Sequence, residues 1–340
     1  MKCSRLLSLL LLLLMGGACR AGGPDTTGTF TNPLLPGGPD PWVIQQDGVY
    51  YYLHTTGHNI TIRKTRAMSE LDKAPAIVLW TPPAKGPDAR DIWAPELHRL
   101  DGKWYLYYTA GSSDSIHPQH TFVLENTAAD PTTGTWESKG QLKDPAADYF
   151  AIDGTILAYK DRHYFIWSGH NGKDVVQRLY IAQLKNPWTL ATARVEIAAP
   201  TYSWEKNGIN EGPEILKNAK NDIFLIFSAS GCWSEDYALG IMQLKKNGDP
   251  LKAADWHKSP LPVLTAKPEN GAYAPGHNGF FKSADGQEDW IIYHANSKAG
   301  QGCGGLRNPR MQPFTWKADG SPDFGEPVKI GEQIRKPGGE

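Results

Sequence analysis

One hairpin-like phrase recurs five times along this chain of 340 residues, and that repetition constrains the fold more than any other feature. Each copy has a polar turn, then a strand rich in β-branched and aromatic residues, then small polar residues where the strand ends. The copies read DGVYYYLHTTG from Asp47, DGKWYLYYTAG from Asp101, DRHYFIWSGH from Asp161, NDIFLIFSASG from Asn221 and EDWIIYHANS from Glu288. A further short strand precedes each turn, so the unit is strand, tight turn, strand, with a period of about 50 to 70 residues.

This repetition predicts an all-β fold, a five-bladed β-propeller of four-stranded blades that spans residues 29–334. Radial repetition of small sheets leaves only short, protected edges, whereas a β-sandwich with as many strands would not repeat one phrase five times. The 35 glycines and 26 prolines are spread along the chain and predict frequent turns. Residues 335–340 read RKPGGE and are expected to form a frayed tail.

Residues 1–18 have the pattern of a secretory signal peptide, because two basic residues precede an apolar run at 6–15 and small residues follow it. The run is too short to span a membrane, so we expect the mature protein to be secreted or periplasmic. Cys19 leaves an alternative open, an outer-membrane lipoprotein with its lipid on that cysteine. Gly16, however, stands where lipoprotein signals normally have a branched aliphatic residue.

The charges are balanced, with 35 lysines and arginines against 36 aspartates and glutamates. Binding to nucleic acid or to an anionic membrane surface depends on a concentrated positive field, so neither kind of partner is expected. A lipid anchor would be the one attachment to a membrane, and we expect a monomer.

Two cysteines remain after the leader, Cys232 and Cys303. In an oxidising compartment an even pair is typical of a disulfide. Each follows the second strand of its unit, in the neighbouring units four and five, so both are expected on loops at the same face. Two unpaired thiols are the alternative.

Acidic residues and a histidine stand where the first strand of several units begins. The five starts read GPDPWV, WAPEL, IDGTIL, NEGPEIL and GHNGFF. Because the first strand of a propeller blade is innermost, Asp40, Asp153, Glu211 and His277 are expected to converge on the axis. Acidic groups are costly to bury unless they are paired or functional, so this position is a candidate site.

A set of carboxyl groups around one pocket is what hydrolysis of a glycosidic bond requires. One acid is protonated and assists the leaving oxygen, while the other is ionised and activates water or attacks carbon. A third acid beside the proton donor raises its pKa by like-charge repulsion. The sequence has no GxSxG, HExxH or CxxC motif that would favour a serine hydrolase, a metalloprotease or a thiol redox site.

The ordered motifs PDPWV, DIWAPEL, AIDGTIL, NEGPEIL and APGHNGFF resemble glycoside hydrolase family 43, whose members are five-bladed propellers with an inverting mechanism. The resemblance covers essentially the whole chain after the leader. It implies that Asp40 is the general base that activates water and that Glu211 is the general acid. Asp153 resembles the acid that modulates the pKa and orientation of the proton donor. Glu214 is a rival for the acid role, and we expect it to be structural.

The resemblance also implies binding residues. Trp93 resembles a wall of the sugar subsite, and Arg307 resembles an arginine that reaches sugar hydroxyls, with Arg310 as the alternative. His277 matches a histidine that in many members holds a calcium ion at the axis, largely through water, while the chemistry itself needs no cofactor. Trp42 stands where a small residue is common, which predicts a different pocket floor beside the general base.

The amino-acid sequence of the last blade resembles that of secreted exo-acting α-L-arabinofuranosidases. We therefore expect an inverting enzyme that releases terminal α-L-arabinofuranosyl residues from arabinan or arabinoxylan, which are plant cell-wall polysaccharides. A β-xylosidase or endo-arabinanase of the same fold is the alternative, and a non-catalytic carbohydrate-binding propeller is the alternative outside the enzymes. Inversion leaves room for a water molecule, so the Asp40 and Glu211 carboxyl groups are expected roughly 6.5–9.5 Å apart.

Overall fold

The structure is a computed structural model that describes residues 28–114, 118–144 and 146–340. The expected signal peptide and Cys19 lie outside the described residues. Within the described part of the chain, the helices are four short 3₁₀ segments, η1 (Met68–Lys73), η2 (Lys206–Gly208), η3 (Ala253–Asp255) and η4 (Pro268–Asn270). None of them has the length and apolar character that crossing a membrane would require.

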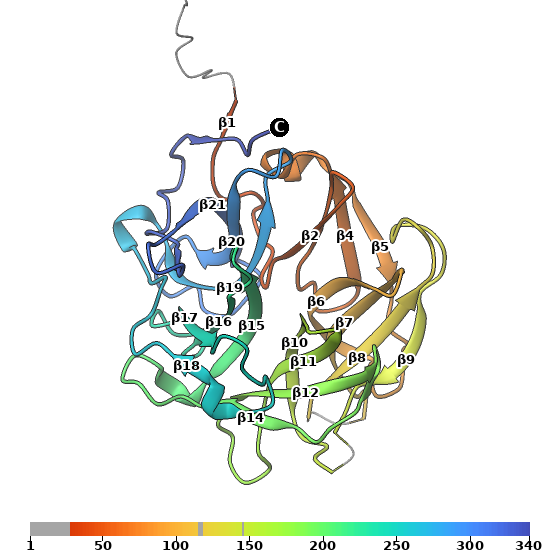
Figure 1. Ribbon diagram of the computed structural model, residues 1–340. Helices are drawn as coiled ribbons and strands as arrows, with labels where there is room; N and C mark the ends of the chain where they lie inside the picture. Colours follow the sequence, from red (N-terminus) through yellow and green to blue (C-terminus); the bar gives the residue numbers. More distant parts are fainter. Residues whose placement is uncertain (1–27, 115–117, 145) are drawn as a thin grey trace, which may run out of the picture.

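Five antiparallel sheets surround a central axis, which confirms the predicted five-bladed propeller (Figure 1). The first blade consists of β2 (Trp42–Gln46), β3 (Val49–Leu53), β4 (Ile60–Thr65) and β5 (Ala76–Trp80). The second consists of β6 (Arg90–Leu100), β7 (Lys103–Gly111), β8 (His120–Asn126) and β9 (Glu137–Gln141). The third consists of β10 (Ala151–Tyr159), β11 (Arg162–Gly169), β12 (Arg178–Asn186), β13 (Thr189–Leu190) and β14 (Val195–Ala198), the last two sharing the outer edge beside β12.

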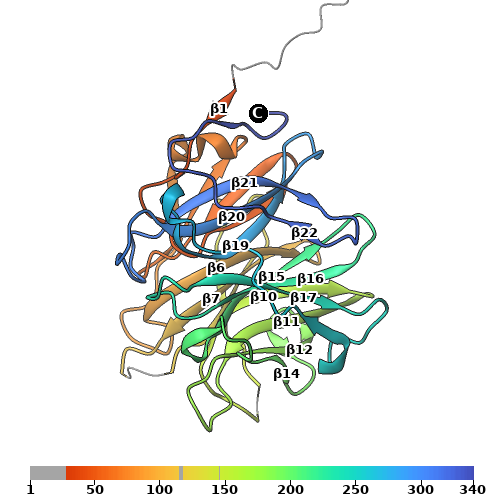
Figure 2. The ribbon, with the colours of Figure 1, turned by 90° about the vertical axis from the view of Figure 1, so that its left-hand side faces the viewer.

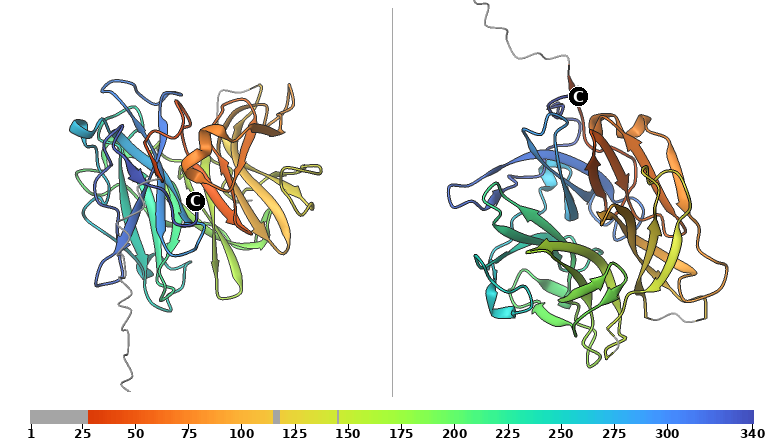
Figure 3. Two further views of the ribbon diagram at one scale, coloured as in Figure 1. Left: turned by 90° about the horizontal axis from the view of Figure 1, so that it is seen from above. Right: turned by 45° about the vertical axis from the view of Figure 1, so that its right-hand side comes forward.

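The remaining two blades follow the same plan. The fourth consists of β15 (Asn210–Lys217), β16 (Ile223–Ala229), β17 (Ala238–Leu244) and β18 (Trp256–Lys258). The fifth consists of β19 (Tyr273–Lys282), β20 (Asp289–Asn296), β21 (Asn308–Trp316) and β22 (Pro322–Asp323). Figure 1 shows the five first strands, β2, β6, β10, β15 and β19, around the centre of the molecule, and Figure 3 shows the blades from two other directions.

The recurring hydrophobic phrases are the second strands of the blades, and they form the core. Every residue of β16 is buried, because a middle strand packs against a neighbouring blade on each face of its sheet. The core is therefore a series of apolar layers between blades. One such layer joins Leu53 of the first blade to Leu97 and Trp104 of the second.

The two ends of the described chain meet. Strand β1 (Thr29–Phe30) pairs antiparallel with β23 (Ile334–Arg335). Figure 2 shows β1 close to the C-terminus. The expectation of a frayed tail is wrong, because the Glu340 carboxylate accepts hydrogen bonds from the backbone N–H groups of Met68, at 2.7 Å, and Ser69, at 3.1 Å. These bonds join the end of the chain to the 3₁₀ segment of the first blade.

Bulges interrupt four of the five first strands close to where they begin, and β2 is regular. The pairing of β10 with β11 shifts between Ile152 and Thr155, that of β15 with β16 between Glu211 and Glu214, and β6 and β19 each contain two such shifts. A bulge sets two residues opposite one and turns a side chain away from the regular alternation. The first strands of the third and fourth blades thus leave the regular pattern where Asp153 and Glu211 occur.

Candidate active site

The backbone at this position is left-handed in several blades. The φ angle is +56° at Asp40, +55° at Asp153 and +44° at His277, and Gly212, which follows Glu211, has +53°. Non-glycine residues rarely adopt such angles, and they persist only where surrounding contacts enforce them.

The small polar residues that end each recurring phrase supply those contacts. In every blade, a side chain from the end of the second strand bonds the backbone where the first strand of the next blade begins. The Oγ1 atoms of Thr55 and Thr109 accept from the N–H of Ala94 (2.7 Å) and Asp153 (3.2 Å); Ser168 Oγ donates to the carbonyl of Asn210 (2.8 Å); Ser228 Oγ accepts from the N–H of His277 (2.8 Å); His294 Nδ1 accepts from the N–H of Asp40 (3.0 Å). The phrase thus contributes to the core with its apolar residues and fixes the strand starts at the axis with one polar residue near its end.

The strand starts open into one cavity of about 420 Å³. All six side chains that the sequence singles out for chemistry, sugar binding or an ion line this cavity: Asp40, Trp93, Asp153, Glu211, His277 and Arg307. They come from five blades, so their meeting depends on the closed ring and not on any one segment of sequence.

Asp40 lies among cationic and hydrogen-bonding groups. Its Oδ1 is 2.8 Å from Arg307 Nη1 and 3.3 Å from His277 Nδ1, and Thr55 Oγ1 donates to its Oδ2 at 2.6 Å. Burial alone would raise the pKa of Asp40, but the Arg307 guanidinium and then the two imidazoles of His277 and His294 outweigh it and hold the pKa well below its usual value. Asp40 is therefore ionised across the physiological pH range.

Glu211 has the opposite electrostatic environment. Burial raises its pKa to about 7, and the negative charge of Asp40 adds to that increase. Tyr237 opposes the increase, because its hydroxyl donates to Glu211 Oε1 at 2.8 Å and so stabilises the charged form. Below neutral pH this carboxyl group keeps its proton and can act as an acid.

Asp153 stands beside Glu211. Its Oδ2 accepts a hydrogen bond at 3.1 Å from the backbone N–H of Gly212, the residue after Glu211. Burial, and then repulsion from Glu211 and Asp40, raises the pKa of Asp153 well above its usual value. The contact with Gly212 gives Asp153 a direct hold on the strand that carries Glu211.

The residues left as rivals lie elsewhere. Glu214 does not line the cavity; it is buried and its Oε2 accepts from Trp42 Nε1 at 3.2 Å. Trp42 points to this buried group and not to the pocket floor, where the sequence had indicated a change. Arg310 is fully buried in the fifth blade, where its Nε donates to Asn308, so Arg307 is the arginine of the cavity.

His277 lies beside the Asp40 carboxylate, with its Nδ1 3.3 Å from Asp40 Oδ1. Among the described residues, no three His, Cys, Asp or Glu side chains come together in a way that could hold a metal ion. Calcium takes six to eight oxygen ligands, so the side chains around His277 do not by themselves fit that ion. A calcium ion held at His277 largely through water stays a prediction.

A disulfide joins Cys232 to Cys303, which confirms the expected pair. The two Cα atoms are 5.0 Å apart although the cysteines are 71 positions apart in sequence. Both cysteines line the cavity, on the loops that follow the second strands of blades four and five. An oxidised bond therefore links two loops at the mouth of the site.

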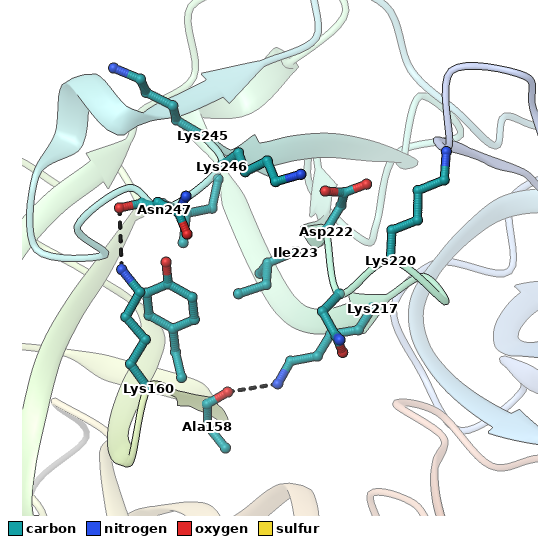
Figure 4. A pocket seen from close by; sticks show the side chains of 12 residues that line it. Ala158, Lys160, Lys217, Lys220, Asp222, Ile223, Lys245, Lys246 and Asn247 are labelled. Carbon is teal, nitrogen blue, oxygen red and sulfur yellow. Dashed lines mark hydrogen bonds between the residues drawn. The ribbon is translucent and has the colours of Figure 1, made fainter.

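A second cavity, of about 380 Å³, lies between the ends of the third- and fourth-blade strands, on the opposite side from the strand starts (Figure 4). Among the described residues that line this cavity are five lysines and one carboxylate, that of Asp222. Two of the lysines bond backbone carbonyls, Lys160 to Asn247 at 3.3 Å and Lys217 to Ala158 at 2.6 Å. A cavity with a single carboxylate lacks the acid pair of glycosidic hydrolysis, so it is not the candidate site.

Sequence reasoning missed three residues that support the site. Thr55 and His294 hold Asp40, and both lie near the end of a recurring phrase, so the repeat register could have indicated them. Tyr237 lies outside the phrases, and only the path of its loop brings it to Glu211.

Comparisons with known proteins agree with this geometry. Residues 30–322 match the family model described as glycosyl hydrolases family 43. The chain is 38% identical over 336 residues to the extracellular exo-α-(1→5)-L-arabinofuranosidase of Streptomyces avermitilis, an alignment that covers 96% of this chain and 69% of that protein. It is 34% identical to α-L-arabinofuranosidase 43 of Humicola insolens, over 92% of this chain and 66% of that protein.

A solved structure agrees as well. The α-L-arabinofuranosidase from Lactobacillus brevis superposes with a TM-score of 0.83 at 32% identity, over 89% of this chain and 98% of that one. The likeness therefore extends through all five blades.

Proposed function

The chain belongs to glycoside hydrolase family 43 and is a glycoside hydrolase, and from this premise we propose that it is an inverting exo-α-L-arabinofuranosidase. Its substrates would be the terminal α-L-arabinofuranosyl residues of arabinan or arabinoxylan. The observation that carries the proposal is the opposite pKa shift of Asp40 and Glu211 within one cavity. The names of the relatives support arabinose as the sugar.

Asp40 would be the general base. It accepts a proton from a water molecule while the water oxygen forms a bond to the anomeric carbon from one face of the sugar. Its low pKa and its contact with Arg307 support this role, because the group must be ionised when the substrate binds.

Glu211 would be the general acid. It donates its proton to the glycosidic oxygen as the bond from that oxygen to the anomeric carbon breaks on the opposite face. The products are an arabinose of inverted configuration and the shortened glycan. Exchange of protons with solvent then restores the ionised Asp40 and the protonated Glu211.

The other residues would position the substrate and the acid. Asp153 would orient Glu211 through its bond to Gly212, and Trp93 would form a wall of the sugar subsite. Arg307 would contact sugar hydroxyls and hold Asp40 in its ionised form.

Secretion and state of assembly belong to the same proposal. We propose that the leader directs export to the periplasm or the medium, in line with the extracellular relatives, with a lipid anchor on Cys19 as the alternative. The disulfide fits an oxidising compartment. We also propose that the enzyme acts as a monomer.

One set of assays tests the activity. We expect the enzyme to hydrolyse 4-nitrophenyl α-L-arabinofuranoside faster than 4-nitrophenyl β-D-xyloside, and to release arabinose alone from linear arabinan. A preference for the xyloside would indicate a β-xylosidase, and oligosaccharide products would indicate an endo-arabinanase. Absence of turnover with binding to arabinan would indicate a binding propeller. NMR of the first product formed should show the inverted anomer, and a retained anomer would contradict the water-activating role of Asp40.

A further inference from the structure

Two large apolar side chains stay exposed where the disulfide joins its loops. Trp233, next to Cys232, is 61% exposed, and Leu306, three residues after Cys303, is 57% exposed. Trp233 lines the catalytic cavity, and so do Gly304 and Gly305 on the opposite loop. Single exposed apolar residues are common on protein surfaces, so exposure alone assigns no role.

Trp233 is held in place by its neighbours although it is exposed. Its indole lies against the backbone of Gly231, so close that a Cβ atom added at Gly231 would lie 2.5 Å from the ring. The Gly231 N–H bonds the side chain of Asn207 at 3.2 Å, and the Gly231 carbonyl accepts from Ser234 at 2.8 Å. With the disulfide on Cys232, these contacts fix the ring before a ligand arrives, which reduces the entropy that binding would cost.

The same loop leads to the proposed acid. Four residues after Trp233, Tyr237 donates its hydrogen bond to Glu211. Glu211 would protonate the oxygen of the leaving group, so the part of the glycan that leaves must pass on the side of the cavity where Glu211 stands. The loop that carries Tyr237 to Glu211 also carries Trp233, which lines the cavity.

We propose that Trp233 binds the sugar next to the one released, on the leaving-group side of the glycosidic bond. This inference rests on the proposed function. A flat aromatic ring suits the C–H face of a sugar and tolerates the hydroxyl pattern around its edge. Trp233 would then make the enzyme prefer oligosaccharides and polymers to simple arabinosides.

The test compares two substrates of one enzyme, α-1,5-arabinotriose and methyl α-L-arabinofuranoside, whose leaving group has no ring. In Trp233→Ala, the ratio of kcat/KM for arabinotriose to kcat/KM for the methyl arabinoside should fall about two- to tenfold, the range for one aromatic contact. Most of the change should be in KM, and Trp233→Phe should restore part of the ratio. Leu261→Ala is the matched control, because Leu261 is 69% exposed and lies outside the cavity.

Equal losses on both substrates in Trp233→Ala would overturn the inference, as would an unchanged ratio. Circular dichroism and the Tm of each variant show whether it folds. A wild-type enzyme that hydrolyses neither arabinoside would contradict the proposed function, but the role of Trp233 could still be tested with another sugar. The same ratio would then be measured with xylotriose and methyl β-D-xyloside.

Discussion

Two sets of buried carboxyl groups lie on the propeller axis, and they differ in their partners. The first set, Asp40, Asp153 and Glu211, lines the cavity, and the cationic Arg307 keeps Asp40 charged. The second set, Glu96 and Glu214, does not line it, and the two lie close enough for the charge of Glu96 to raise the pKa of Glu214.

The second set has only neutral partners among its described contacts. Trp42 donates to Glu214, and His98 Nε2 lies 2.8 Å from Glu96. Burial lowers the pKa of His98 to about 3, so its imidazole is neutral, and burial raises the pKa of both glutamates well above the usual value. Two buried carboxyl groups that repel each other do not both ionise, so the pair keeps a proton.

The comparison shows that a place on the axis does not by itself give an acidic group a catalytic role. Glu211 and Glu214 are three residues apart on one strand, and the bulge between them directs one to the cavity and leaves the other beneath it. Access to the cavity separates the working carboxyl groups from the structural ones, and within the working set the cation beside Asp40 separates the ionised base from the protonated acid.

The largest expected difference between the sets is in turnover. Asp40→Asn should lower kcat/KM on 4-nitrophenyl α-L-arabinofuranoside about 10²–10⁴-fold, because the amide cannot accept a proton from water. Glu211→Gln should cause a loss of similar size on arabino-oligosaccharides, whose leaving group needs a proton. Glu214→Gln is the matched control and should keep activity within a few-fold, since a neutral amide mimics a protonated acid.

A large loss in Glu214→Gln with an unchanged fold would reverse the assignment of the two glutamates. Near-wild-type turnover in Asp40→Asn would remove the general base from the proposal. Unfolding curves for each variant separate loss of chemistry from loss of structure.

The next effect is in the pH dependence, which should report Glu211. The acid must be protonated to act, so kcat/KM should fall as pH rises through about 7. Tyr237→Phe removes the hydrogen bond that lowers the pKa of Glu211, so the fall should move to higher pH, by about one to two units for a bond to a charged group. Tyr293→Phe, in which the lost bond is to Gln312, should leave the profile unchanged. A shift to lower pH in Tyr237→Phe would contradict the contact.

The sequence allowed prediction of the features that repeat. Because the phrase recurs, Asp40, Asp153 and Glu211 could be placed at strand starts that face one axis without any coordinates. Repetition does not reveal local irregularity. Alternation along a strand predicts that Trp42 shares the side of Asp40, but the left-handed backbone at Asp40 breaks the alternation, and Trp42 turns to Glu214. The contact of Tyr237 depends on a loop path that has no periodicity.

The smallest expected effect is in stability. The pKa of Glu96 is raised in the folded state, so between the unfolded value near 4.5 and the folded value the native protein binds more protons than the unfolded chain. The free energy of unfolding of the wild type therefore decreases as pH rises through that interval. Glu96→Gln has no proton to lose, so its stability relative to the wild type should increase between pH 5 and pH 8, measured by urea unfolding at each pH.

Glu125→Gln gives the opposite sign and completes the comparison. Glu125 is buried too, but Tyr105, Lys139 and Lys103 bond its carboxylate, and these bonds outweigh burial and lower its pKa. Its charge therefore contributes stability above the unfolded pKa, and Glu125→Gln should be less stable than the wild type at pH 8, with a difference that shrinks toward pH 4. If the curves for Glu96→Gln and the wild type ran parallel from pH 5 to pH 8, Glu96 and Glu214 would not keep a proton, and the distinction between the two sets of carboxyl groups would rest on cavity access alone.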